Sequence, residues 1–246
     1  MDPVIDVENI SFAYDGRPVL ENVSVSIERG ELLGIIGPNG GGKTTLLKIM
    51  LGLLSPDAGR VSLFGSPTNR FEDGQRIGYV AQHATETQRQ IPITVREVVR
   101  MGRYPHVGLN GLTATDERLV DEALEKTDIA DLADSRVGNL SGGQKQRTYI
   151  ARVLAGEADL LALDEPTVGI DADAQERFYD LIDELNRDNV TIVLVEHDLD
   201  AVLEYASSIA CINRTLDYHG DATSFLESEA LVETFGTAGR AIKALS

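Results

Sequence analysis

The sequence has little cysteine, little positive charge and no long apolar run, and each shortage narrows what the chain can do. Its single cysteine, Cys211, excludes a disulfide within the chain. Cys211 lies in the apolar stretch 208–212, so we expect a core residue rather than a reactive thiol. No apolar run approaches the ~18 residues that a membrane-spanning helix needs. The acidic start, residues 1–6, lacks the basic-then-apolar order of a signal peptide, so we expect a cytosolic protein.

Positive charge is scarce, because 22 lysines and arginines face 40 aspartates and glutamates, for a net charge of −18. Such a surface argues against nucleic-acid binding, which needs basic patches, and against adhesion to anionic lipid by charge alone. It resembles the acidic surfaces of proteins from organisms with high internal salt, where ions screen the repulsion among like charges. We therefore expect no nucleic acid among the partners and a surface of the halophilic, acidic kind.

The chain does contain a complete phosphate-binding pattern at residues 37–45. This pattern follows an apolar run at 32–36, which predicts a buried strand, and precedes a segment at 46–51 with apolar residues at helical spacing. Glycines allow main-chain N–H groups to wrap a phosphate at the positive end of the following helix. Lys43 can reach the outer phosphates, and the Thr44 hydroxyl can ligate Mg²⁺. The alternative is a glycine turn that only joins strand to helix, but the full spacing and the flanks favour a nucleotide site. Its candidate residues are Gly37, Pro38, Asn39, Gly40, Gly41, Gly42, Lys43, Thr44 and Thr45.

Two further core strands are expected to end in polar side chains. The apolar run up to residue 163 is followed by Asp164 and Glu165, and the run up to residue 195 is followed by Glu196 and His197. The carboxyl ends of core strands line the ligand crevice of an α/β fold. Asp164 is suited to hold Mg²⁺, Glu165 to orient or deprotonate an attacking water, and His197 to reach a γ-phosphate. Lys43, Glu165 and His197 are therefore the candidate catalytic residues.

Two stretches allow more than one interpretation. Tyr14 precedes a turn expected at 15–18, and it either stacks on a purine or is an ordinary strand-end tyrosine. Residues 140–144, Leu-Ser-Gly-Gly-Gln, open a predicted helix. Ser141 either caps that helix, or the glycines beside it form a second phosphate-binding helix terminus. The local chemistry of these residues does not choose between the alternatives.

The expected fold class is α/β. Residues 4–29 alternate apolar and polar side chains, which predicts antiparallel strands. Residues 94–135 show two apolar helical faces, with a break at 102–106 and a capping box from Thr113 to Asp116. We predict one nucleotide-binding domain over 1–246, with a core at about 1–83 and 150–225. A helical subdomain is inserted at about 84–150, and a helical tail follows at 226–246.

From residue 4 to about 220, these segments in this order resemble the ATP-binding subunits of ABC transporters. Residues 140–144 are similar to the family's signature, which separates ABC ATPases from other P-loop enzymes, and residues 37–45 match its Walker A loop. The resemblance implies a P-loop NTPase core with an antiparallel β subdomain and an α-helical subdomain. It also implies ATP and Mg²⁺ as cofactors, and a homodimer in which two copies sandwich two nucleotides head to tail.

By position, the resemblance implies a role for each matching residue. Tyr14 matches the aromatic that stacks on adenine, and Gln82 matches the glutamine that senses Mg²⁺ and couples to the membrane partner. Asp164 and Glu165 match the Walker B acid and the catalytic carboxylate, and His197 matches the switch histidine. The implied Mg²⁺ ligands are Thr44, Gln82 and Asp164. The residues implied to contact ATP held by the opposite subunit are Ser141, Gly142, Gly143, Gln144 and the D-loop residue Asp171.

Within the family, residues 91–105, residues 158–161 with 168–171, and residues 211–214 resemble importers of the zinc and manganese type. Iron-siderophore and cobalamin importers share a stretch similar to residues 102–106, and they form the alternative cargo class. Such importers act with integral membrane permease subunits and, indirectly, with an extracytoplasmic solute-binding protein. The implied location is the cytoplasmic face of the cell membrane, and we place permease docking within residues 83–110. A non-transport ABC ATPase acting on ribosomes or DNA ends is the alternative from another class, but the chain has one cassette and no long coiled coil.

Overall fold

A computed structural model describes residues 3–82, 92–108 and 111–243. Its contacts divide the chain into two compact units, one formed by residues 1–72 and 191–246 and the other by residues 73–190. Each unit combines strands with helices, so the predicted α/β class is confirmed. The subdomain boundary predicted near residue 84 falls in the segment 83–91, outside the described residues.

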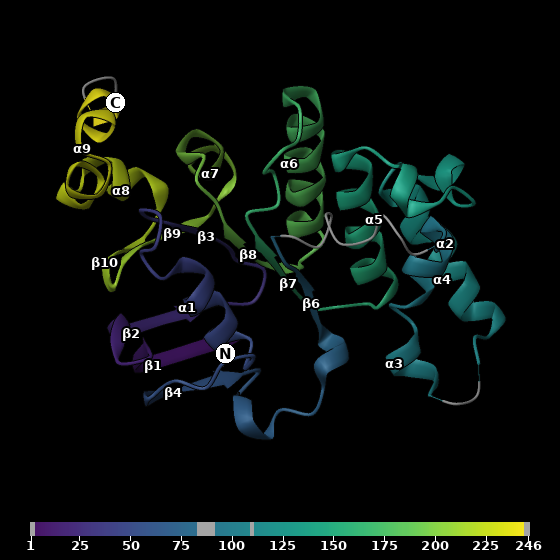
Figure 1. Ribbon diagram of the computed structural model, residues 1–246, viewed down its shortest axis with the longest axis horizontal. Helices are drawn as coiled ribbons and strands as arrows, with labels where there is room; N and C mark the ends of the chain where they lie inside the picture. The colour runs from purple at the N-terminus through teal and green to yellow at the C-terminus, as the bar shows by residue number, and fades with distance from the viewer. Residues whose placement is uncertain (1–2, 83–91, 109–110, 244–246) are drawn as a thin grey trace. The chain divides into compact units, whose positions relative to one another are not determined.

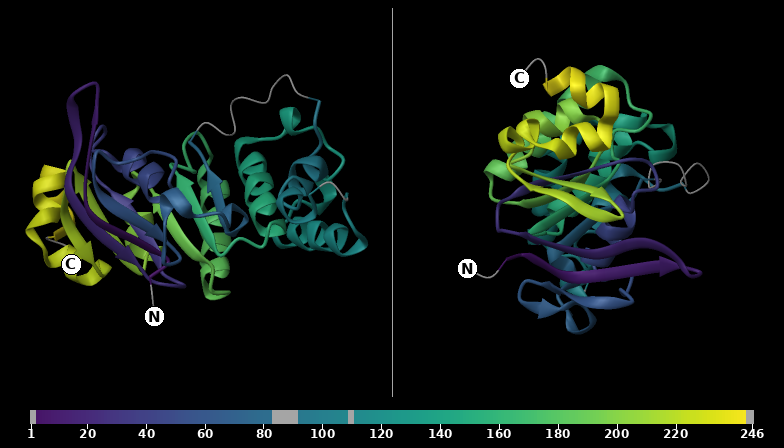
Figure 2. Two further views of the ribbon diagram at one scale, coloured as in Figure 1. Left: turned by 90° about the horizontal axis from the view of Figure 1, so that it is seen from below. Right: turned by 90° about the vertical axis from the view of Figure 1, so that its left-hand side faces the viewer.

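The first unit contains an antiparallel sheet whose strands follow the order β2-β1-β4-β5. Its members are β1 (Ile5–Tyr14), β2 (Arg17–Ile27), β4 (Ala58–Leu63) and β5 (Ser66–Pro67). The long purple hairpin in Figure 2 is β1 and β2, and its two turn residues, Asp15 and Gly16, both have positive φ. From Val23 to Ile27, the apolar side chains of β2 are buried at alternate positions, as the period of a strand requires. The predicted antiparallel strands are confirmed.

The first unit also contains strands in the order β10-β9-β3-β8. They are β3 (Leu32–Ile36), β8 (Thr191–Val195), β9 (Ser208–Asn213) and β10 (Thr215–Gly220). β3 runs parallel to β8 and β9, and every residue of β3 and β8 is buried, which explains their continuous apolar sequences. The helices of this unit are α1 (Lys43–Met50), α7 (Leu199–Tyr205), α8 (Ala222–Glu227), α9 (Glu229–Lys243) and the short η1 (Thr68–Arg70). The C-terminal helices thus begin at Ala222, four residues before the predicted start of the tail.

Cys211 lies inside this unit, on β9. Its side chain is fully buried, and its Sγ is 3.0 Å from the hydroxyl of Thr234 on α9, which packs on β9 (Figure 1). Burial raises the pKa of the Cys211 thiol to about 11. The prediction of a core cysteine is confirmed.

The second unit contains two parallel strands, β6 (Ile77–Val80) and β7 (Leu160–Asp164), which pair from Ile77 with Leu160 to Val80 with Leu163. Its helices are α2 (Val95–Arg100), α3 (Tyr104–Val107), α4 (Ala114–Lys126), α5 (Gly142–Ala155) and α6 (Ala172–Arg187), with short η2 (Gly74–Arg76), η3 (Ala130–Leu132) and η4 (Val137–Asn139). The helices α2, α4 and α5 pack on one another, and α5 also packs on β6 and α6 (Figure 1). The strand β6 therefore packs against α5, which belongs to a layer of helices, and β6 pairs with β7.

Capping boxes start three of these helices. Thr94, Thr113 and Ser141 cap α2, α4 and α5, and in each case the residue three positions later returns a hydrogen bond. The predicted capping box of α4 is confirmed. The predicted break between the two helical faces is confirmed, because α2 ends at Arg100 and α4 begins at Ala114. The break contains the four-residue helix α3, whose first turn holds a proline where no N–H is needed.

Candidate functional site

The phosphate-binding loop lies between β3 and α1, and its main chain takes conformations that favour glycine. Gly37 and Gly42 have φ values of 145° and 99°, a region that side chains rarely adopt. A Cβ on Gly37 would lie 2.0 Å from the main-chain oxygen of Ile212, so the loop passes β9 too closely for any side chain there. Gly42 is the N-cap of α1. The first N–H groups of α1 therefore face the loop, which is the arrangement of an anion-binding helix terminus.

Lys43 is the first residue of α1, and its side chain folds back over the start of the loop. It is 5% exposed, and its Nζ donates hydrogen bonds to the main-chain oxygens of Gly37 at 3.0 Å and Pro38 at 3.2 Å. A buried ammonium needs such acceptors, and phosphate oxygens form stronger, charge-assisted bonds with it. Lys43 thus lies where a phosphate in the loop would be within its reach.

Tyr14 and His197 belong to the same unit as the loop. Tyr14 is the last residue of β1, and 48% of it is exposed, with its ring edge-on to Phe12 at 4.8 Å between centroids. Its exposed face is open to stacking, although the strand-end interpretation fits the same position. His197 is exposed and follows β8 by two residues. Its main-chain N–H donates to the carboxylate of the buried Glu196 at 3.1 Å, while the Glu196 N–H donates to Ile35 of β3 at 3.2 Å.

The acid pair stands at the end of β7. Asp164 is 2% exposed and accepts a hydrogen bond from the Tyr79 hydroxyl of β6 at 3.4 Å. Burial, followed by the charge of Asp164, raises the pKa of Tyr79 to about 12, so this phenol stays a donor at physiological pH. Glu165 has a φ of 48°, an uncommon left-handed conformation for a residue with a side chain. The side-chain amide of Gln82 donates to the Glu165 carboxylate. The second unit thus brings together three of the predicted site residues.

The donors predicted for Mg²⁺ are a hydroxyl, an amide and a carboxylate, from Thr44, Gln82 and Asp164. Mg²⁺ is a hard cation that prefers oxygen ligands of these kinds, usually one or two carboxylates together with substrate phosphates. The buried carboxylate of Asp164 at a strand end and a threonine beside the loop lysine supply that chemistry. Each of these three residues therefore supplies a donor of a kind that this ion takes.

The signature segment opens α5, and its local geometry is that of a capped helix. The Ser141 hydroxyl accepts from the Gln144 N–H at 3.3 Å, and the Ser141 N–H donates to the Gln144 side chain at 2.9 Å. The start of α5 also contacts the start of α6, where a Cβ on Gly143 would lie 3.0 Å from that of Ala174. Asp171 caps α6 by accepting the Ala174 N–H at 3.0 Å. The capping interpretation of Ser141 is confirmed, while the contact of this segment with a partner's nucleotide stays a prediction.

The structure also contains a buried arginine, Arg103, which was noted only as part of the stretch 102–106 that resembles importers. Arg103 is 6% exposed, and its Nε donates to Asp116 of α4 at 2.9 Å. Its guanidinium also donates to the main-chain oxygen of Ala155 at 2.9 Å and to Glu157 at 2.7 Å. Arg103 therefore links α4 and the end of α5. Its partners lie 13, 52 and 54 residues away in the sequence, so no local pattern reveals the contact.

The predicted residues divide between the two units. The first unit holds Tyr14, the loop residues 37–45 and His197, and the second holds Gln82, residues 141–144, Asp164, Glu165 and Asp171. Tyr79, which touches Asp164, was not among the predicted site residues. Its signal in the sequence is slight, since it is one aromatic in a short apolar strand three residues before Gln82.

Across the described residues, no helix is long and apolar enough to cross a membrane.

Comparisons with known proteins converge on one family. The model of the family described as ABC transporter matches residues 20–168. The chain is 41% identical over 227 residues to the zinc uptake system ATP-binding protein ZurA of Listeria innocua, covering 92% of this chain and 88% of that protein. It is 36% identical over 234 residues to the manganese transport system ATP-binding protein MntA of Synechocystis, covering 94% of this chain and 90% of that protein. A solved dimeric ATP-binding cassette in a post-hydrolysis state with ADP and Pi matches with a TM-score of 0.75 and 28% identity, covering 89% of this chain and 98% of that one.

Proposed function

This chain belongs to the ABC transporter family, and from that premise we propose that it is the ATP-binding and ATP-hydrolysing subunit of an importer for zinc or manganese ions. The observation that carries the proposal is the phosphate-binding loop with its buried Lys43, in a chain whose relatives at 36–41% identity are named as metal-uptake ATP-binding proteins. Those names favour zinc or manganese over the iron-siderophore and cobalamin classes. They also favour transport over a non-transport ABC ATPase.

Each residue of the proposed site has its own role in ATP hydrolysis. The loop N–H groups and Lys43 bind the phosphates and stabilise the charge that develops on the γ-phosphate. Glu165 orients the attacking water and takes up its proton, and His197 contacts the γ-phosphate. Tyr14 stacks on the adenine, worth about 1–3 kcal/mol if it behaves as base stacking does elsewhere. Mg²⁺, held by Thr44, Gln82 and Asp164, would neutralise phosphate charge when bound.

We infer that the protein works as a homodimer bound to integral membrane permease subunits at the cytoplasmic face of the membrane. Dimeric cassettes among the structural relatives support the pairing, in which residues 141–144 and Asp171 would contact the partner's nucleotide. We propose that the permease docks within residues 83–110, of which 83–91 and 109–110 lie outside the described residues. In the described part, Met101 and Tyr104 are 40% and 52% exposed and offer an apolar contact. A solute-binding protein would act through the permease.

The experiment that tests this function is a pull-down of tagged Glu165→Gln protein with ATP, in mild detergent and high salt, with mass spectrometry of the partners. We expect a multi-span membrane protein in stoichiometric amount, whose metal specificity can then be assayed. A Lys43→Ala variant treated identically controls for ATP-independent capture. Recovery of only ribosomal or other non-membrane partners would refute the importer and leave an ABC ATPase with a different task.

We also propose that the acidic surface suits a cytoplasm of high ionic strength. At a net charge of −18, repulsion among carboxylates opposes the folded state, and added salt screens it over a few ångströms. We expect the melting temperature to rise between about 0.1 M and 2 M KCl, measured by scanning calorimetry. A protein most stable at low ionic strength would contradict this proposal.

A further inference from the structure

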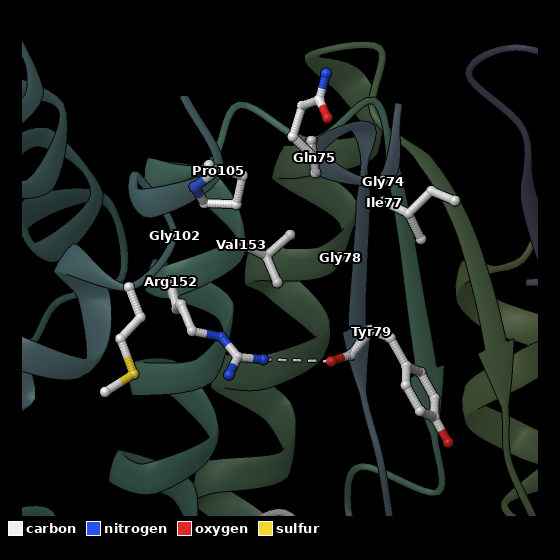
Figure 3. A pocket seen from close by; sticks show the side chains of 12 residues that line it. Gly74, Gln75, Ile77, Gly78, Tyr79, Gly102, Pro105, Arg152 and Val153 are labelled. Carbon is white, nitrogen blue, oxygen red and sulfur yellow. Dashed lines mark hydrogen bonds between the residues drawn. The ribbon is translucent and has the colours of Figure 1, made fainter. Parts of the chain in front are cut away.

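The strand β6 lines a pocket, and one of its residues also forms a hydrogen bond with Asp164. The pocket, of roughly 210 Å³, lies between β6, the segment 101–105 and the end of α5 (Figure 3). Gly78 lets β6 approach α5 closely, because a Cβ there would lie 2.0 Å from the Val153 side chain. The residue after this glycine, Tyr79, lines the pocket and also touches Asp164. One residue of β6 thus belongs to both surroundings.

The main chain of Tyr79 is held from two directions. It pairs with Ala162 of β7 in the parallel ladder, and its carbonyl oxygen accepts a hydrogen bond from the Arg152 guanidinium at 3.4 Å (Figure 3). Arg152 itself is held over the ring of Tyr149 at 5.4 Å from the centroid. The backbone from which the Tyr79 ring extends is therefore fixed.

The phenol of Tyr79 points away from Arg152, as Figure 3 shows, and its hydroxyl donates to Oδ2 of Asp164 at 3.4 Å. A tyrosine ring has two rotatable bonds, so a fixed backbone and a half-buried ring leave the hydroxyl little freedom. Donors to a metal-ligating carboxylate set its orientation, and such outer partners affect metal affinity. Asp164 ends its strand, where the ladder no longer constrains the neighbouring main chain.

We propose that Tyr79 is a positioning residue for Asp164, so that its hydroxyl orients the carboxylate that serves the nucleotide-bound Mg²⁺. The proposal rests on the proposed ATPase function, which it deepens by one residue. The alternative is that Tyr79 only fills space between β6 and the end of β7. The two accounts differ in what the hydroxyl does, since a phenylalanine keeps the ring and removes only the donor.

The test measures the affinity of a fluorescent ATP analogue for the full chain, once in EDTA and once with Mg²⁺. For Tyr79→Phe we expect unchanged affinity in EDTA, because the phosphate-binding loop supplies that binding. The gain in affinity on adding Mg²⁺ should fall about fivefold, less than the loss of a short charge-assisted bond, because 3.4 Å is long for this kind of contact. In the same variant, the Mg²⁺ concentration that gives half of the maximal fluorescence change should rise by a similar factor.

The matched control is Tyr149→Phe, which removes a hydroxyl from the neighbouring helix α5. That hydroxyl is buried without a partner among the described residues, so its loss should leave both affinities unchanged. A Tyr79→Phe protein with the wild-type gain from Mg²⁺ would overturn the positioning role. Equal losses in EDTA and in Mg²⁺ would also overturn it, because they indicate a packing defect. A wild-type protein without nucleotide binding would instead refute the proposed function itself.

Discussion

Replacing Glu165 by glutamine is expected to lower ATP turnover about 100-fold or more, while ATP binding is kept. Glutamine has nearly the same shape, so it can occupy the left-handed backbone position at the end of β7 and stay beside Gln82. It cannot take up the proton of an attacking water, and a positioned base contributes roughly 100-fold to 10,000-fold. Phosphate release measures the turnover, and titration calorimetry measures the binding.

In the homodimer proposed above, the same variant should accumulate as an ATP-bound pair, because hydrolysis would no longer reopen it. Size-exclusion chromatography with ATP and Mg²⁺ would show the shift in elution. Glu122→Gln is the control, since Glu122 is a half-exposed acid paired with Arg118 on the surface of α4. Turnover at the wild-type rate in Glu165→Gln would remove Glu165 from the catalytic role.

Replacing Arg103 by methionine is expected to lower the melting temperature by roughly 10 °C. The change leaves the carboxylate of Asp116 buried, at 4% exposed, without its guanidinium partner. It also removes the donor that satisfies the main-chain oxygen of Ala155 at the end of α5. A broken buried pair is costly because the remaining group keeps its desolvation penalty. Scanning calorimetry at neutral pH gives the shift.

The pH dependence of that shift follows from Asp116. The Thr113 hydroxyl, then the Thr113 N–H and then Arg103 lower the pKa of Asp116 from 3.8 to about 2. Because the folded pKa is lower than the unfolded one, the ionised form stabilises the protein above about pH 4 and this contribution is lost as pH falls toward 2. The difference in melting temperature between wild type and Arg103→Met should therefore narrow over that range.

Arg96→Met is the matched control, because Arg96 pairs with Asp121 where the two side chains are 29% and 52% exposed. Ion pairs at the surface contribute little to the free energy of unfolding, so we expect the melting temperature to change by about 2 °C or less. If Arg103→Met lowers the melting temperature no more than this control, the buried arginine does not hold the helices together.

Features that depend on neighbouring residues were predictable from the sequence. The loop at 37–45 joins a buried strand to a helix because glycines, an apolar run and a helical repeat are adjacent in the chain. The capping box of α4 needs only Thr113 and Asp116, and the strand ending at Asp164 needs only its own apolar run. Each rests on a period or a cap that a few consecutive residues specify.

Features that depend on distant residues were not predictable. The hydroxyl of Tyr79 meets Asp164 across 85 residues of sequence, and only the pairing of β6 with β7 brings them together. The stretch at 102–106 predicted a break between helices and resembled importers of one cargo class. It did not reveal that Arg103 forms hydrogen bonds with Asp116 of α4 and Ala155 of α5. Its side chain looked exposed by type, because an isolated arginine is mostly a surface residue. Tertiary packing decides such cases.

The burial of Cys211 makes this chain convenient for labelling. A thiol that is fully buried, with a pKa near 11, is neither accessible nor ionised at neutral pH, so a maleimide dye leaves it unmodified. Because the sequence has no second cysteine, a cysteine introduced at an exposed position such as Val168 would carry the only fluorophore. In the proposed homodimer, the distance between the labels of two copies could then be followed by energy transfer through the ATP cycle, without first replacing the native cysteine.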